Sequence, residues 1–79
     1  MVKDISIKSV HDILELNDIA AEQDFDLHVS SKSIKINAKS FLGLLILLNK
    51  DVKLVAPDHI NIERFQEVIN KLPKRMLKD

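Results

Sequence analysis

The sequence predicts a small α+β domain in which three helices cover one face of a four-stranded antiparallel sheet, in the order β-α-β-β-α-β-α. Two observations predict this class. Segments with alternating apolar and polar residues are interleaved with segments whose apolar residues recur at helical spacing. Each predicted helix carries one apolar stripe, so all the helices pack on the same side of one sheet. We expect residues 1–79 to form a single domain.

Composition narrows the class of function. The chain has 79 residues and a formal net charge of +0, with three Phe and no Tyr, Trp or Cys. Balanced charge and few aromatic residues argue against direct binding of nucleic acid. The N-terminal "MVKDISIK" has no signal-peptide pattern, and the apolar run 41–48 is too short to span a bilayer. We therefore expect a cytoplasmic protein without membrane insertion, and the lack of Cys agrees with a reducing compartment.

The N-terminal residues predict a strand followed by a helix. Ile5 and Ile7 alternate with polar residues, which is typical of a strand with one buried face. Ser9 then precedes the segment "VHDILELNDIAA", with Asp12 three residues later, an approximate capping box. The expected buried stripe of this helix is Val10, Ile13, Leu16 or Leu14, Ala20 and Ala21.

The middle of the chain predicts a hairpin and a second helix. "DFDLHVS" alternates through Phe25, Leu27 and Val29, and "SIKIN" continues the pattern beyond a polar turn. The run "SFLGLLILL" fits either a buried helix or a buried strand. We favour a helix because Leu prefers helices to strands and because Ser40 or Asn37 offers an N-cap.

The C-terminal third predicts the last strand and a third helix. "DVKLVA" places Val52 and Leu54 on one face of a strand, and "NIERFQEVINKL" follows with Asn61 as its cap and Pro73 as its end. The expected stripe of this helix is Ile62, Phe65, Val68, Ile69 and Leu72. This order of elements is also compatible with a ferredoxin-like sheet or with other antiparallel sandwiches.

Three segments resemble a known family. "INAKSFLGLL" resembles the segment around the regulatory serine of HPr, the histidine-containing phosphocarrier of bacterial sugar phosphotransferase systems. "AAEQDFDLHV" is similar to the end of the first helix and the second strand of that family, and "FQEVINKL" is similar to its third helix. The resemblance covers most of the chain. It implies an HPr-like open-faced β-sandwich, four antiparallel strands under three helices.

The phosphocarrier motif of the family is incomplete in this chain. The family has a histidine at the start of its first helix, followed by a small residue, an arginine and a proline, whereas this chain has "SVHDILE". One register aligns Ser9 with the histidine and His11 with the arginine. A shift of two residues aligns His11 with the histidine, but neither register restores the arginine or the proline.

His11 is the candidate phosphoacceptor. A neutral imidazole is nucleophilic, and a helix N-terminus favours the phosphate that the imidazole would carry. Asp12 adds a negative charge beside that phosphate, however, and the first helical turn holds no Lys or Arg to neutralise it. A solvated polar residue is the simpler interpretation of His11.

Ser40 is the candidate regulatory site. Its simplest role is an N-cap, but a phosphate there would add nearly two negative charges where the helix dipole favours them. The resemblance implies that Phe41, Leu42 and Leu45 match the apolar docking surface of the family. A short helix cannot bury every aliphatic residue of this run, so some must be exposed to a partner or to a second copy of the chain. Gly43 would allow another element to approach closely.

The sequence contains none of the usual enzyme motifs. Three scattered histidines without metal-ligand spacing argue against a metal site, and no Gly-rich phosphate loop, nucleophile elbow or triad is present, so we expect no cofactor and no independent enzyme. The resemblance implies a regulatory or docking module of the phosphotransferase system. Its partners would be other proteins of that system, HPr kinase or a transcriptional regulator. The alternative is an active phosphocarrier acting through His11, and a ferredoxin-like binding module is a distant third.

Overall fold

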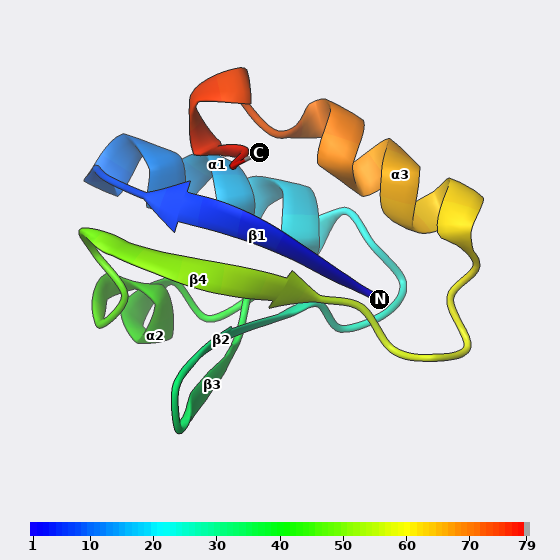
Figure 1. Ribbon diagram of the computed structural model, residues 1–79, viewed down its shortest axis with the longest axis horizontal. Helices are drawn as coiled ribbons and strands as arrows, with labels where there is room; N and C mark the ends of the chain where they lie inside the picture. The colour runs from blue at the N-terminus through cyan, green and yellow to red at the C-terminus, as the bar shows by residue number, and fades with distance from the viewer. Residues whose placement is uncertain (79) are drawn as a thin grey trace.

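The computed structural model describes residues 1–78 and has the predicted order of strands and helices, with one additional 3-10 turn (Figure 1). The elements in chain order are β1 (Val2–Ile7), α1 (Val10–Ala21), β2 (His28–Ser31), β3 (Ile34–Asn37), α2 (Phe41–Leu45), β4 (Lys50–Val55), α3 (Ile62–Lys71) and η1 (Lys74–Met76).

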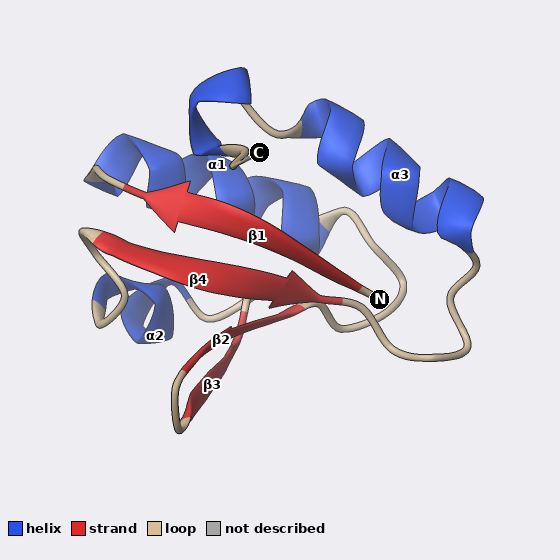
Figure 2. Cartoon of the chain, in the orientation of Figure 1, coloured by secondary structure: helices blue, strands red, loops and turns tan. Residues whose placement is uncertain are grey.

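The four strands form one antiparallel sheet in the order β1-β4-β2-β3 (Figure 2). β1 pairs with β4 along its whole length, and β2 lies between β4 and β3. β1 and β3 are therefore the edge strands. Beyond η1 the chain runs alongside β1, where Leu77 forms a bridge with Ile5 and the N–H of Lys78 donates to the carbonyl of Asp4 at 3.3 Å. We call residues 74–78 the C-terminal strap.

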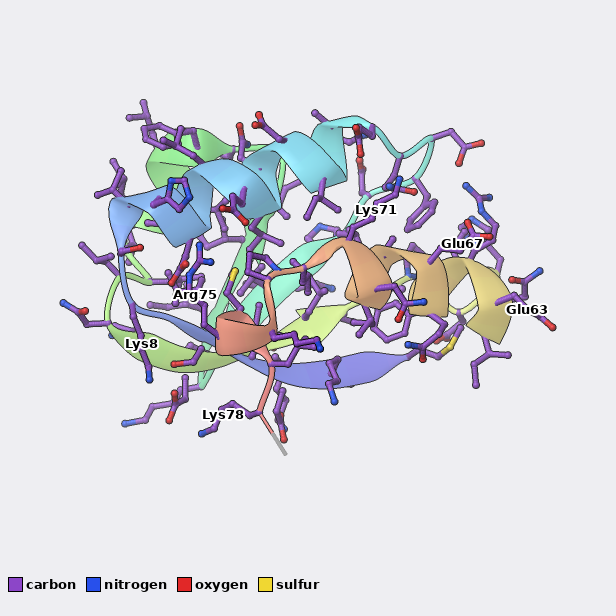
Figure 3. The ribbon with its side chains drawn as sticks, turned by 90° about the horizontal axis from the view of Figure 1, so that it is seen from above. Lys8, Glu63, Glu67, Lys71, Arg75 and Lys78 are labelled. Atoms are coloured by element: carbon purple, nitrogen blue, oxygen red, sulfur yellow. The ribbon has the colours of Figure 1, made fainter. Side chains whose placement is uncertain are left out.

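The two faces of the sheet have opposite character. Ile5, Val29 and Leu54 point toward the helices and are buried. Asp4 and Lys53 lie opposite each other on the other face and form an ion pair at 2.7 Å. Figures 1 and 3 show the three α-helices on the apolar side of the sheet. The open side is polar, as the alternation in the sequence predicts.

α1 is capped as predicted, but its buried stripe differs from the prediction. The Ser9 hydroxyl accepts a hydrogen bond from the N–H of Asp12 at 3.1 Å. The buried apolar residues are Ile13, Leu16, Ile19 and Ala20. Of the predicted stripe, Leu16 and not its alternative Leu14 is buried. Including Val10 and Ala21 was wrong, because they lie with Leu14 on a flank of α1 that remains exposed.

β2 is shorter than the alternation predicted. It begins at His28, and Phe25 and Leu27 belong to the preceding loop although both are buried. Apolar alternation therefore marked burial correctly but not strand pairing. Lys32 and Ser33 form the hairpin turn, and Lys32 has a positive φ of 53°.

The run 40–48, which the sequence left open between helix and strand, contains a helix that is shorter than the run. Only Phe41–Leu45 are α-helical, and Leu44 and Leu47 are fully buried. Gly43 packs against β3, where an added Cβ would come within 2.7 Å of Ile36 Cγ2. The expectation of a close approach at Gly43 is thus confirmed, and the approaching element is internal.

α3 agrees with its predicted cap, stripe and end, with one exception. The side chain of Asn61 accepts the N–H of Arg64 at 2.9 Å. Four of the five predicted stripe residues are buried, but Ile62 is 67% exposed because the first turn of α3 extends past the start of β1 (Figure 1). The sequence did not predict η1, which follows Pro73 and buries Met76 completely.

Candidate functional site

His11 lies in the first turn of α1, where Ser9 caps the helix. The His11 side chain is 69% exposed, and its Nε2 lies 2.6 Å from Oε1 of Glu15, one turn further along the helix. That contact fixes the ring by one nitrogen and leaves Nδ1 without a partner in the described part of the chain. His11 is thus accessible, and its orientation is set by a carboxylate.

Asp12 is a buried structural residue, whereas the sequence suggested only a negative charge beside the phosphate that His11 would carry. Its side chain is 3% exposed. Oδ2 accepts the backbone N–H of Lys8 at 3.0 Å, and Oδ1 accepts Nε–H of Arg75 at 2.8 Å. Burial on its own raises the pKa of Asp12, but the hydrogen bonds from Lys8 and Arg75 outweigh burial and hold that pKa below its ordinary value.

Arg75 supplies the cation that the first turn of α1 lacks in sequence. It projects from η1 toward α1 (Figure 3), and its Nη2 lies 3.2 Å from Oε1 of Glu15. Arg75 therefore bridges Asp12 and Glu15 across a separation of 63 and 60 residues. Sequence reasoning missed Arg75, because no local pattern in "PKRML" connects it with "SVHDILE".

Ser40 caps α2, as predicted. Its Oγ accepts the N–H of Gly43 at 3.1 Å, and the residue is exposed to solvent. The neighbouring Lys39 is paired with Asp26, with Nζ 3.4 Å from Oδ1. The hydroxyl is thus accessible from solvent while it stabilises the start of the helix.

The predicted docking residues differ in exposure. Leu42 is 76% exposed, whereas Phe41 and Leu45 are partly buried and pack against the core. Ile46, which follows α2, is 56% exposed. The expectation that this run cannot be wholly buried is confirmed, and Ile46 is an exposed position that the resemblance did not indicate.

α1 contributes two further exposed apolar residues, Val10 at 45% and Leu14 at 46%. They lie on the same flank of α1 as Asn17, because positions three and four apart face one way on a helix. The Asn17 side chain donates to the carbonyl of Ala38, just before α2, and α1 and α2 are in contact. This flank of α1 therefore faces α2. We call Val10, Leu14, Leu42 and Ile46 the apolar face.

The apolar face and His11 lie on different flanks of α1. His11 and Glu15 point toward η1 and Arg75, whereas Val10 and Leu14 point toward α2. The structure thus places the two candidate sites on one helix without merging them. Arg75 belongs to the site around His11, and α2 carries part of the apolar face.

The open side of the sheet has a shallow hollow of about 510 Å³ that includes none of the predicted site residues. Its charged lining is largely paired, since Asp4 contacts Lys53 and Asp51 contacts Lys78 at 2.8 Å. Within residues 1–78, no group of His, Cys, Asp or Glu is arranged to hold a metal ion. In the same part of the chain, no helix is both long and apolar enough to cross a membrane.

No protein-family model matches this chain, and no curated protein matches it. The fold class itself is a small α+β protein with an open four-stranded antiparallel sheet and three α-helices.

Proposed function

We propose that this chain is a non-enzymatic docking module with an HPr-like fold, which acts with proteins of a phosphotransferase system in the cytoplasm. The observation that carries this proposal is the apolar face, four exposed aliphatic side chains on α1, on α2 and on the residue that follows α2, with the two helices in contact. Soluble proteins seldom leave such side chains grouped on their surface unless a partner covers them. Leu42 is the most exposed of the four and is the expected anchor.

The arrangement of strands supports an HPr-like fold over a ferredoxin-like one. β1 lies at an edge of the sheet and pairs with β4 alone, whereas a ferredoxin-like sheet holds its first strand in the interior. The three helices on one face and the segments "INAKSFLGLL" and "FQEVINKL" support the same assignment.

Ser40 is the proposed switch of this module. It is exposed and precedes Leu42 by two residues, so a phosphate on its hydroxyl would place nearly two negative charges at the rim of the apolar face. The free N–H groups at the start of α2 favour that charge, so modification need not unfold the helix. Phosphorylation would instead exclude an acidic partner, or recruit a basic one.

Intact-mass analysis after incubation with HPr kinase and ATP tests the switch. We expect one phosphoryl group on the wild-type chain and none on Ser40→Ala. Ser9→Ala is the matched control, because Ser9 also caps a helix and should leave the modification unchanged. A well-folded chain that HPr kinase does not label would refute the regulatory role of Ser40.

A pair of substitutions at exposed apolar residues tests the docking face. Leu42→Glu should weaken binding to phosphotransferase proteins at least about tenfold in calorimetry, because it puts a charge at the centre of the contact. Ile62→Glu changes a residue of similar exposure on α3 and should leave binding unchanged. Sedimentation of both variants shows whether a second copy covers the face. Equal effects of the two substitutions would contradict the assignment.

Phosphoryl transfer through His11 is the second candidate function. The specific observation in its favour is that Glu15 holds Nε2 while Nδ1 stays available, with Arg75 within reach of the same carboxylate. Phosphoenolpyruvate and the general phosphotransferase enzyme provide the test. An acid-labile adduct that is lost in His11→Ala would support the carrier role, and the absence of any adduct would exclude it.

A further inference from the structure

Charge is separated between the two sides of the molecule, although its formal net charge is zero. Residues 10–26, which include α1, contain acidic residues but no Lys or Arg. Within residues 1–78, the acidic residues that form no ion pair lie in α1, in α3 or in the loop before α3: Asp18, Asp58, Glu63 and Glu67. The helix side therefore carries uncompensated negative charge.

The sheet carries the matching excess of positive charge. In the same part of the chain, all but one of the lysines that form no ion pair lie in strands or directly beside them: Lys3, Lys8, Lys32, Lys35 and Lys50. Figure 3 shows Glu63 and Glu67 along α3, away from Lys8 and Lys78. The two signs of free charge thus belong to different sides of the fold.

The hollow on the open side of the sheet lies within this basic region. Its charged lining consists of Lys32, Lys53 and Lys78 with Asp4 and Asp51, so cations exceed carboxylates. Lys53 and Lys78 pair with the two aspartates, whereas Lys32 forms no ion pair among the described residues. A hydrogen bond from Lys78 is the main cause that holds the pKa of Asp51 below its ordinary value, and the charge of Lys8 contributes.

A row of side chains continues the basic region from the hollow to the edge of the sheet. Ser30 of β2 lies opposite Lys53 of β4 on one side and opposite Lys35 of β3 on the other. Two strand spacings separate the lysines, which is about 10 Å. A neutral hydroxyl group therefore lies between two cations. We call Lys32, Lys35, Lys53 and Lys78 the basic face.

The carboxylates already on this side can be replaced by those of a partner. The side chains of Asp4 and Lys53 are 56% and 59% exposed, and those of Asp51 and Lys78 are 64% and 42% exposed. Ion pairs between exposed side chains contribute little free energy. An incoming carboxylate therefore gains a lysine without breaking a strong internal contact.

The spacing of charges on this side fits an acidic polypeptide better than a nucleic acid. Asp4 and Asp51 lie among the lysines, so a continuous row of phosphates would meet like charges. The described residues that line the hollow include no aromatic side chain on which a base could stack. Separate carboxylates with neutral residues between them avoid the first conflict and do not need stacking.

A second copy of this chain is a poor source of those carboxylates. Glu22, Asp24 and Asp26, at the acidic end of α1 and in the loop that follows it, already pair with cations of their own chain. Each would have to lose its internal partner before it could bind another molecule. The occupant is therefore expected to be a different protein.

We propose that the basic face docks an acidic segment of a partner protein, in which neutral residues separate the carboxylates. Lys32, Lys35 and Lys53 bind the carboxylates, and the Ser30 hydroxyl accepts or donates a hydrogen bond between them. The apolar face lies on the helix side of the sheet, so the chain can hold a second partner at the same time. This site does not depend on the function proposed above.

Titration of the isotope-labelled full chain at low ionic strength with a synthetic peptide of alternating glutamate and serine tests this site. Alternate side chains of an extended peptide face one way, so the glutamates can meet the sheet together. We expect saturable binding, with amide shifts at Ser30, Lys35 and Lys53 and none at Leu42. The same peptide with glutamine in place of every glutamate should not bind.

Two double variants with the same change in net charge separate a defined site from general attraction. Lys32→Asn with Lys35→Gln should weaken binding about tenfold, and asparagine tolerates the positive φ of residue 32. Lys71→Gln with Lys74→Gln removes two cations from α3 and η1 and should change binding less than about twofold. Lys35→Gln alone provides the same comparison if the turn variant is poorly folded.

Asp51→Asn gives a prediction of opposite sign. It removes a competing carboxylate from Lys78 and should strengthen binding of the glutamate peptide about threefold. Leu42→Glu should bind this peptide as the wild-type chain does. A failure of the apolar face is thus distinguishable from a failure of the basic face.

Four results would overturn the proposal. The first is the absence of saturable binding, and the second is an equal loss in the two double variants. The third is tighter binding of a single-stranded oligonucleotide with the same number of charges, which would make the partner a nucleic acid. The fourth is self-association in sedimentation that Lys35→Gln abolishes, which would make the occupant a second copy.

Discussion

The absence of a side chain at Gly43 allows α2 to pack closely on the sheet. Gly43 leaves room for the branched side chain of Ile36, whose Cγ2 would be 2.7 Å from an added Cβ. The sequence marked this glycine as the only one in the chain, yet it could not say which element approaches it. A β-branched neighbour is stiff about χ1, so it has little freedom to move aside.

Gly43→Ala should therefore destabilise the domain, although alanine favours helices. The helical preference contributes up to about 1 kcal/mol in favour of alanine, and overpacking costs about 1–3 kcal/mol. We expect a net loss of about 1 kcal/mol in the free energy of unfolding, measured with urea. In an Ile36→Ala background the same change should become neutral or stabilising. Destabilisation of equal size in both backgrounds would rule out the clash.

At the scale of elements, local patterns in the sequence predicted which segments are strands or helices and in what order they follow. They did not predict which residues of α1 are buried, because α1 has apolar residues on two flanks. α1 carries apolar residues on the flank that faces the sheet and on the flank that faces α2. Periodicity alone could not separate these flanks, so it predicted Val10 in the buried stripe and left Leu14 as an alternative to Leu16. The five residues of α2 are too few to cover the second flank, which is why both stay exposed.

The β2–β3 hairpin gives a prediction at this scale. Lys32 has a φ of 53°, a conformation that is unfavourable for a residue with a Cβ and favourable for glycine. Lys32→Gly should raise the free energy of unfolding by up to about 1 kcal/mol and increase the Tm. Lys35→Gly, in the extended part of the same hairpin, should lower both quantities. Calorimetry of the two variants measures the difference, and a lower Tm for Lys32→Gly would contradict the turn geometry.

For the whole molecule, contacts between residues far apart in the sequence are the main feature that could not be predicted. The sheet order and the contact between Asp12 and Arg75 depend on where segments meet in space, and no spacing pattern encodes either. Asp12 was interpreted as an unfavourable charge beside His11, because its partner lies 63 residues away. The caps at Ser9, Ser40 and Asn61 were predictable because each involves atoms only three residues apart.

The stability of the whole domain should depend on the charge of Asp12. Its pKa is lower in the folded chain than in the unfolded one, so its contribution is present above the unfolded pKa and is lost as pH falls through the folded pKa. At pH 7, Asp12→Asn should lower the free energy of unfolding by about 2–3 kcal/mol. The difference from the wild-type chain should shrink toward pH 3.

Urea unfolding of both chains at pH 7 and pH 3 measures this dependence. Asp24→Asn is the control, because Asp24 also forms an ion pair with an arginine, Arg64. Asp24 is largely exposed, so this substitution should change the free energy of unfolding only slightly at either pH. A constant difference between wild type and Asp12→Asn across the two conditions would show that shape, and not charge, accounts for the role of Asp12.

The C-terminal strap also limits how copies of this chain can associate through their sheets. An approaching strand finds Leu77 and Lys78 already beside Ile5 and Asp4, whereas the four-residue outer edge of β3 pairs with no other described strand. Continuous stacking of strands into a fibre requires two open edges on every molecule. The strap covers the middle of β1, so β3 is the more open of the two edges of the sheet.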